Sequence, residues 1–503
     1  MNGSWVGRSA RLVGQTFRVR THLLGAAMLV GLVAGAGAVV FVVASQVVSH
    51  FTLDRLAGLH PPPLPGEASF EWLGGHGVRV RPWLLLIVPT LGGLLTGLLV
   101  FTVAPEAEGH GTDAAIEAYH FHDGYVRPRV PLVKTIASAI TIGSGGSGGR
   151  EGPIAQIGAG FGSILAGLLK LPASDRRVLT GAGVGAGIAA IFKSPLAGAL
   201  FASEVLYSSP EFEPDVIIPA GVASVVSYCT AGAFAGYRPL FSMPDMTFDN
   251  AWQLGPYLVL AIFVTILAAL YTRTFYATTR VFHGMKTIPP HFRPAIGAFG
   301  SGVVALTLFE VFGRDTSVFS VLSYGYDALQ DALNDRSKGA ALVLLAIALG
   351  KIATTSLTIG SGGSGGVFGP SMVIGGCGGG ALGLMFHHYA PTLAPHPAAF
   401  VVVGMAGFFA AAAKTPFSTL VIVSEMTGGY GLLLPALWVC TLSFVLSDPR
   451  SIYGSQLTSR TQSPAHRHDV LERAAALGLE VKGGPANRSG PGQLQDPRQR
   501  SKS

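Results

Sequence analysis

Long apolar stretches separated by short polar segments run along most of the chain, and they predict helices that cross or enter a membrane. The stretches that carry almost no charge are 23–48, 83–103, 257–270, 340–349, 398–413 and 432–446. Some reach the roughly 20 residues that a spanning helix needs, whereas others are too short to span alone. Short or interrupted apolar segments are typical of transporters and channels, whose broken and re-entrant helices line a cavity. We therefore expect an all-α integral membrane protein.

Polar sequence gathers at the two ends of the chain. Residues 1–22 form a basic arm that is expected to stay cytoplasmic. Residues 23–453 are predicted to form one transmembrane domain, within which Asp327–Lys338 is interpreted as a charged loop. Residues 454–503 are rich in Arg, Gln, Ser, Pro and Gly, a composition that predicts a disordered cytoplasmic tail.

Composition agrees with a membrane location. Of the 503 residues, 49% are hydrophobic and only 12% are charged, which is too little charge to coat a soluble globule of this size. The formal net charge of +7 lies largely near the ends, and no basic stripe interleaved with aromatic residues indicates a nucleic-acid partner. The three cysteines lack metal or disulfide spacing, and we expect no metal site. The lipid bilayer is the expected surrounding.

An internal repeat is the strongest pattern in the sequence. Thr141–Gly149 and Thr358–Gly366 both read TIGSGGSGG, at an offset of 358 − 141 = 217. Further matched pairs are Lys134 with Lys351, Pro153 with Pro370, Pro195 with Pro416, and Glu204 with Glu425. The matches predict two repeats, at about 83–230 and 291–447, of the kind that form a transport site at their interface. The letters alone leave open whether the repeats are parallel or inverted.

Each glycine-rich copy is followed by Gly-Pro, which predicts a chain break and then a helix start. The free N–H groups and positive dipole end of a helix start attract an anion. No formal charge, which costs about 2.5–3.5 kcal/mol at the bilayer centre, is needed. A fixed cation would also hold chloride too tightly to conduct. The first copy continues as Arg150-Glu151-Gly152-Pro153 and the second as Val367-Phe368-Gly369-Pro370.

These two motifs resemble anion-filter motifs of the CLC family of chloride channels and proton/chloride exchangers. GREGP at Gly149–Pro153 matches one motif, the G-x-F-x-P pattern at Gly366–Pro370 matches another, and Tyr453 follows the last helix where the family has its pore tyrosine. The resemblance implies two inverted-topology repeats with broken and re-entrant helices. It also implies a homodimer with one pore per subunit, with chloride as ligand and no cofactor.

The resemblance further implies roles for individual residues. The Glu151 carboxylate would occupy the outer anion position and swing away when protonated, so that it gates or couples transport. The N–H groups of Val367 and Phe368 and the Tyr453 hydroxyl would hold the central anion. The full set of anion-binding residues that it implies is Gly149, Arg150, Gly152, Gly366, Val367, Phe368, Tyr453 and His110.

The chain departs from the family pattern at two places. Where the family usually has G-S-G-I-P, the sequence reads Gly109-His110-Gly111-Thr112-Asp113, so an imidazole replaces the serine and the preferred anion stays open. Glu204 is followed by Val205, at the position where proton-coupled members often carry an inner glutamate. Glu204 and Val205 are therefore the proton-path candidates, and Val205 favours passive conduction.

Structural alternatives accompany these roles. Glu151 could simply pair with its neighbour Arg150. Glu204 and Glu425 could hydrogen-bond the glycine-rich backbone, which is the preferred interpretation for Glu425. A satisfied structural role for His110 is about as well supported as an anion contact, and Tyr453 could be an aromatic residue of the membrane interface.

The functional hypothesis is a voltage- and pH-sensitive channel for chloride or similar small anions, gated by Glu151, in a prokaryotic inner membrane, and not an enzyme. The alternative is a proton-coupled anion exchanger on the same scaffold. A remote alternative is a nucleotide-binding membrane enzyme, because residues 143–148 fit G-x-G-x-x-G. That pattern needs an acid about 20 residues further on, and none lies between Glu151 and Asp175.

Overall fold

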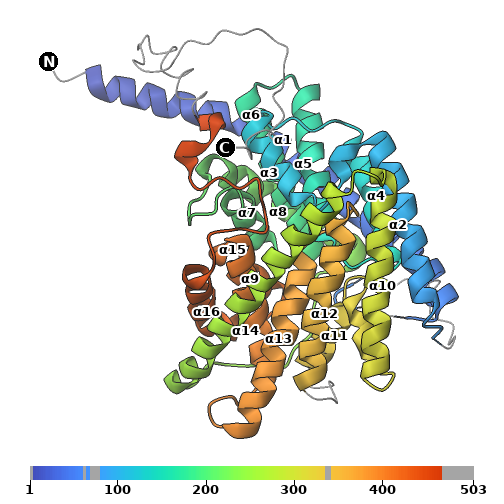
Figure 1. Ribbon diagram of the computed structural model, residues 1–503. Helices are drawn as coiled ribbons and strands as arrows, with labels where there is room; N and C mark the ends of the chain where they lie inside the picture. Colours follow the sequence, from blue (N-terminus) through green and yellow to red (C-terminus); the bar gives the residue numbers. More distant parts are fainter. Residues whose placement is uncertain (1–3, 61–63, 68–79, 335–340, 467–503) are drawn as a thin grey trace, which may run out of the picture.

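A computed structural model describes residues 4–60, 64–67, 80–334 and 341–466 (Figure 1). Within these ranges the chain is helical and contains only isolated β-bridges. The α-helices are α1 (Ser4–Ser49), α2 (Leu84–Val103), α3 (Thr112–Phe121), α4 (Val130–Gly143), α5 (Glu151–Leu168), α6 (Ala173–Phe192), α7 (Pro195–Glu204), α8 (Pro214–Ala235), α9 (Leu254–Gly284), α10 (Arg293–Val311), α11 (Tyr326–Leu333), α12 (Ala341–Gly360), α13 (Phe368–Tyr389), α14 (Pro397–Ala413), α15 (Pro416–Thr427) and α16 (Leu433–Leu446). The all-α prediction is confirmed.

Apolar side chains cover the outside of the helix bundle as well as its core. Seven helices in the described part of the chain are long and apolar enough to cross a membrane. On α2, for example, Leu91 and Leu95 are more than half exposed. In water this exposure would be unfavourable, because burying a leucine side chain stabilises a fold. Lipid is the solvent that such a surface requires, and the chain is therefore an integral, multi-pass membrane protein.

The two repeats fold into equivalent parts that meet near the centre of the molecule. In Figure 1 helices α3 to α8, which belong to the first repeat, gather in the upper part, and helices α11 to α16, which belong to the second, gather in the lower part. The helices that follow the glycine-rich motifs, α5 and α13, both begin at the centre, and they extend into opposite parts. This arrangement is the one that an inverted repeat produces.

Two matched lysines secure the loops that lead into the centre. Lys134 and Lys351 are fully buried. The Lys134 ammonium donates to the carbonyls of Ala107 (3.0 Å) and Gly109 (2.7 Å). The Lys351 ammonium donates to three carbonyls, and the shortest bond is 2.8 Å to Ser323. Because a buried cation is costly unless it is fully hydrogen-bonded, each lysine fixes the course of its loop.

Glu204 and Glu425 each hold the start of a helix in the opposite repeat. Glu204 accepts hydrogen bonds from the backbone N–H groups of Phe417 (3.1 Å) and Ser418 (2.7 Å) in the first turn of α15. Glu425 accepts from Leu196 and Ala197 (2.9 Å) in the first turn of α7. A carboxylate is favourable at the positive end of a helix. The expectation that these acids bond to the glycine-rich backbone is wrong, because the free N–H groups of α7 and α15 are their partners.

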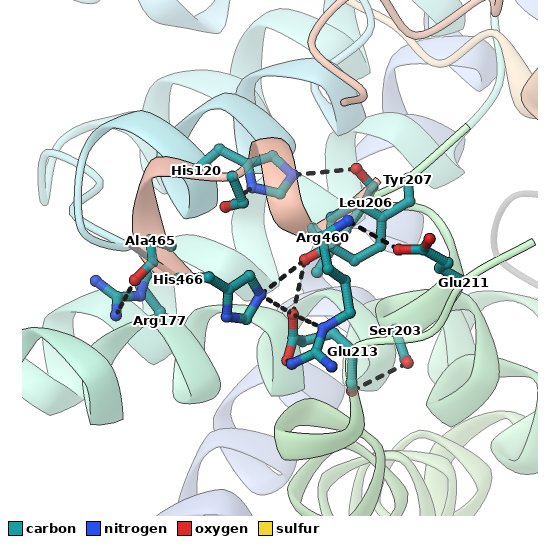
Figure 2. A network of polar contacts seen from close by, with 11 residues as sticks. His120, Arg177, Ser203, Leu206, Tyr207, Glu211, Glu213, Arg460, Ala465 and His466 are labelled. Carbon is teal, nitrogen blue, oxygen red and sulfur yellow. Dashed lines mark hydrogen bonds and ion pairs between the residues drawn. The ribbon is translucent and has the colours of Figure 1, made fainter. Parts of the chain in front are cut away.

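The C-terminal end of the chain differs from the sequence prediction, whereas the N-terminal arm simply continues into the first helix, because α1 begins at Ser4. The prediction that the tail is disordered from residue 454 is wrong for residues 454–466, here called the C-terminal segment, and residues 467–503 lie outside the described ranges. Figure 2 shows this segment packed on the body through Arg460 and His466, which both contact Glu213. Its polar side chains find polar partners on the body, so it needs little apolar burial.

A second difference concerns the charged loop expected at Asp327–Lys338. Residues 326–333 form the short helix α11 instead. The charges do not prevent a helix, because Leu329 and Leu333 lie buried on its other face. Residues 335–340 lie outside the described ranges.

Candidate anion site between the two glycine motifs

The two glycine-rich motifs are hydrogen-bonded to each other. The N–H of Gly149 donates to the carbonyl of Gly366 at 2.7 Å, and the N–H of Gly366 donates to the carbonyl of Gly149 at the same distance. The flanking hydroxyls repeat this reciprocity, with Ser138 to Ser364 and Ser147 to Thr355 both at 2.9 Å. Each contact thus occurs twice, and the equivalent residues of the two repeats exchange roles between the two occurrences. This is the pattern that a two-fold axis between the partners produces. The duplicated letters therefore correspond to a symmetric junction.

Glycine is required at this junction because the backbones approach too closely for a side chain. A Cβ on Gly366 would lie 2.7 Å from the nitrogen of Gly152, and one on Gly149 would lie 2.8 Å from the nitrogen of Gly369. A Cβ on Gly152 would overlap the carbonyl oxygen of His110. The glycines of both motifs thus bring two helix starts and the loop carrying His110 together.

The helix starts bring unpaired backbone N–H groups to this point. Helix α5 begins at Glu151 and α13 begins at Phe368, and each has proline at its third position, Pro153 and Pro370. Proline is tolerated there because its missing N–H would have no partner within the helix. The first N–H groups of both helices carry partial positive charge, which suits an anion.

The Glu151 carboxylate is bound between the two helix starts. Its Oε2 accepts a hydrogen bond from the N–H of Gly369 at 3.0 Å, and its Oε1 accepts one from the Tyr326 hydroxyl. The side chain is almost completely buried. A negatively charged group of this protein thus already lies against the α13 start, where the sequence predicts an anion.

Arg150 does not pair with Glu151. Its guanidinium forms a buried ion pair with Glu67 and stacks on the ring of Tyr324, with Cζ 4.5 Å from the ring centroid. The structural alternative for Glu151, a simple pair with its neighbour, is therefore wrong in this structure. Glu67 is the partner of Arg150 because its segment is attached to the chain around Leu240. The N–H of Gly66 donates to the carbonyl of Leu240 at 3.2 Å.

The residues expected around a central anion also come together. Val367 and Phe368 are buried at the α13 start, and the Phe368 ring packs on Phe409 with centroids 4.0 Å apart. Tyr453 is buried nearby, 6.4 Å from the Phe409 ring. Its hydroxyl has no hydrogen-bond partner of ordinary geometry among the described residues, although the Thr112 hydroxyl lies close. A buried hydroxyl of this kind is able to bind an incoming ligand.

His110 lies beside Tyr453, with the two rings 5.4 Å apart. The imidazole is buried, and its Nδ1 has no hydrogen-bond partner in the part of the chain that the structure describes. The sequence supported two roles for His110 equally: a structural histidine whose hydrogen bonds are all made within the protein, and a direct contact to the anion. The unpaired nitrogen favours the contact, since buried polar atoms are normally hydrogen-bonded.

The proton-path candidates lie at the end of α7. Both oxygens of Glu204 are used to cap α15. Val205 is buried, and its carbonyl accepts a hydrogen bond from the Gln456 amide at 2.8 Å. Glu204 thus has a structural function, and Val205 contributes no titratable group.

Two residues of the site were missed by the sequence analysis, Tyr326 and Glu67. Tyr326 lies 175 positions from Glu151 in the chain, and no motif marks it. The only local signal was the pair of tyrosines around Gly325, whose rings stack 6.0 Å apart. Glu67 lies in a proline- and glycine-rich stretch that gives no sign of a buried carboxylate.

Comparison with known protein families agrees with this geometry. The sequence model described as "Voltage gated chloride channel" matches residues 92–448, which is most of the membrane domain. The chain belongs to the CLC family. The all-helical fold and the coarse function, transport of small anions across a membrane, follow from this membership.

Individual relatives and a solved structure support the family assignment. A protein of Ralstonia nicotianae described as "Putative chloride channel protein ClcB-like" is 31% identical over 74% of this chain and 86% of its own length. An "H(+)/Cl(-) exchange transporter ClcA" of Vibrio parahaemolyticus is 28% identical over 82% of this chain and 87% of its own. The structure of "a slow cyanobacterial Cl-/H+ antiporter" superposes with a TM-score of 0.70 at 22% identity, covering 90% of this chain and 98% of the other. At that identity the superposition establishes the fold.

Proposed function

We propose that this CLC protein is a proton-coupled exchanger of chloride or a similar small anion, with Glu151 as the moving carboxylate. One observation carries the proposal: the Glu151 carboxylate is hydrogen-bonded to the Gly369 N–H at the start of α13. The carboxylate and a transported anion therefore need the same N–H group. Only one of them can bind it at a time.

Protonation links this competition to the proton. A neutral carboxylic acid loses most of its attraction to a helix start, because that attraction is electrostatic. A proton arriving at Glu151 therefore releases the side chain, and an anion takes its place. When the proton leaves, the carboxylate returns and displaces the anion, so the two ions move in alternation.

The central anion would lie further along the path, between the N–H groups of Val367 and Phe368 and the Tyr453 hydroxyl. These groups are neutral, which favours fast release. His110 would contribute its unpaired Nδ1 when that nitrogen carries the proton. This imidazole N–H would replace the serine hydroxyl that the family usually has, and it can donate to chloride as well as to oxyanions. The transport experiment must therefore also compare anions.

The exchanger was the alternative in the sequence analysis, and the relatives named as exchange transporters favour it. The channel hypothesis rests on Val205 and stays a prediction. We further propose that the protein is a homodimer with one pore per subunit in a prokaryotic inner membrane. The bacterial relatives support that location. Cross-linking in native membranes tests the dimer.

Transport by the purified protein in liposomes tests the proposed exchange. With chloride concentrated on one side and no initial pH difference, an exchanger moves protons uphill, which a pH electrode detects. A channel moves chloride alone. Repeating the measurement with nitrate, bromide and fluoride identifies the preferred anion. Chloride flux without proton movement, at a membrane potential clamped with valinomycin, would overturn the exchanger in favour of the channel.

A further inference from the structure

A separate cavity of about 220 Å³ lies between α9, α14 and the segment that follows α16. It contains none of the residues of the anion site. Small residues, including Ala268 and Ala411, leave the space open, and the polar lining includes Arg273, Tyr276 and Arg280. Ser447, Asp448 and Arg450 complete the lining from the last segment before Tyr453.

The cavity carries an excess of positive charge. Asp448 is its acidic residue, with Oδ2 3.3 Å from Arg273 and Oδ1 4.0 Å from the Arg450 guanidinium. Arg280 adds a third cation, whose Nε donates to the carbonyl of Tyr276 at 3.3 Å. The lining therefore holds three guanidinium groups and one carboxylate, which pairs with Arg273 and Arg450. The Arg273 and Arg450 side chains are 68% and 76% exposed, so they remain free to turn toward a ligand.

The cavity lies where the membrane surface is expected. The candidate span that contains α9 has 34 residues, which at about 1.5 Å per residue exceeds the roughly 30 Å hydrocarbon core. Its apolar part ends at Leu270, and its first arginines follow at 273 and 280. The arginines thus lie in the C-terminal part of α9, beyond its apolar stretch, and Tyr276 between them bonds to Ile452 just before the C-terminal segment.

An exposed apolar stripe on α9 leads directly to the cavity. Ile262, Ile266 and Leu270 are 46%, 61% and 44% exposed. They follow one another at four-residue steps, and Arg273 continues the same face three residues later. A molecule with an acyl chain on this stripe would place its head group at the arginines.

We propose that this cavity is a binding site for a phosphate group, carried by an anionic phospholipid or free in solution. Guanidinium groups bind tetrahedral oxyanions through two parallel N–H bonds, which a spherical halide does not accept in the same way. Arg273, Arg280 and Arg450 supply such forks from two sides, and the Tyr276 side chain lies beside them. The apolar stripe favours the phospholipid as the source.

Occupancy of the cavity would act on the anion site through the backbone. The Tyr276 hydroxyl donates to the carbonyl of Ile452 at 3.0 Å, directly before Tyr453. Asp448 accepts the N–H of Arg450 at 3.0 Å, which shapes the turn into that segment. A phosphate that fixes Arg450 therefore steadies the chain that carries Tyr453. This effect on transport rests on the proposed function, whereas the binding itself does not.

Thermal unfolding and lipid binding of the full-length protein test the site. With chloride held constant, so that the proposed anion site is filled equally, added inorganic phosphate should raise the melting temperature in detergent. In native mass spectrometry, phosphatidylglycerol should be retained in preference to phosphatidylcholine. The double variant R273A/R280A should weaken either interaction at least tenfold, R273K/R280K should weaken it less, and D448N should strengthen it. Arg314→Ala, at an exposed pair with Glu310, is the matched control.

The possible outcomes separate the sources and the two proposals. Retention of phosphatidylglycerol without a response to inorganic phosphate identifies the lipid head group, and a response to phosphate alone identifies the free ion. Equal binding by the wild type and both double variants, or no response to phosphate together with no lipid preference, would overturn the site. Proton-coupled chloride transport by the wild type is measured separately. A negative result for phosphate binding therefore does not affect the proposed exchange, and a negative result for exchange does not affect the proposed phosphate site.

Discussion

Gly149 and Gly366 hydrogen-bond each other through both N–H groups, at 2.7 Å in each direction. They are also counterparts in the repeat, since 366 − 149 gives the offset of 217 that separates the duplicated motifs. Each glycine thus binds its own equivalent, and the two-fold axis passes between them. The positions of both helix starts depend on this junction.

An alanine at the junction should separate the helix starts. In G366A the new Cβ would lie 2.7 Å from the Gly152 nitrogen and 2.9 Å from the Gly149 oxygen. Overpacking of this kind costs about 1–3 kcal/mol, so we expect a lower melting temperature and at least tenfold slower anion flux. A Cβ on Gly167 in α5 would meet nothing within 4 Å, so G167A is the control and should behave as the wild type. Wild-type flux from G366A would contradict the role of the junction.

The Tyr326 hydroxyl should hold the Glu151 carboxylate in the anion position. A hydrogen bond to a charged group contributes about 1.5–3 kcal/mol, so in Y326F chloride should displace the carboxylate more easily. We expect roughly ten- to hundredfold tighter chloride binding by isothermal titration calorimetry. Y324F is the matched control, because the neighbouring tyrosine stacks on Tyr326 and makes no hydrogen bond to Glu151 that the structure records. Equal chloride affinity in the two variants would argue against this contact.

The Glu67 carboxylate should tune the outer part of the path by neutralising Arg150. In E67Q the buried guanidinium loses its partner, and breaking a buried pair costs about 3–5 kcal/mol. The freed cation should attract external anions, so the apparent affinity for external chloride rises and the turnover falls. Flux measured against external chloride concentration tests this. E106Q, which breaks the more exposed pair with Arg127, should leave the affinity unchanged, and an equal effect of both variants would refute the assignment.

Docking of the C-terminal segment should weaken in acid. His120 lies outside the candidate spans and contacts Ser463 of the segment at 2.9 Å. Burial lowers the pKa of His120 from 6.5 to about 4. The undocked state therefore binds more protons between these values, and stability is lost as the pH falls through this window. Burial raises the pKa of Glu213, but the hydrogen bonds from His466 and Tyr207, together with the electrostatic attraction to His466 and Arg460, leave the pKa lowered. Its contribution is therefore lost only at still lower pH.

Hydrogen exchange of residues 455–466 between pH 7 and 4 checks this prediction. In the wild type, protection from exchange should decrease as the pH falls from 7 to 4. In H120Q it should change less over the same range. His122 is exposed and does not contact the segment in the structure, so H122Q is the control. Protection that is constant across this range would show that His120 does not control docking.

The sequence predicted those parts of the molecule that depend on repetition and periodicity. The duplicated TIGSGGSGG motifs revealed the junction, because a symmetric contact needs the same residues on both sides. Tyr326 and Glu67 could not be found, since only the tertiary fold brings them to Glu151 and Arg150. The C-terminal segment was taken for a disordered tail because its composition is polar, yet the single amide of Gln456 donates to the carbonyls of Val205, Tyr207 and Ala413. Composition does not record such partners.

The location of a bound anion in the E151Q variant tests the central claim most directly. Without the carboxylate charge, the N–H of Gly369 at the α13 start should be free to bind a halide. Crystals of E151Q grown in bromide should therefore show an anomalous peak within about 3.5 Å of that nitrogen, where the wild type has the Glu151 carboxylate. Ordered helix starts with no bromide at this position would contradict the account.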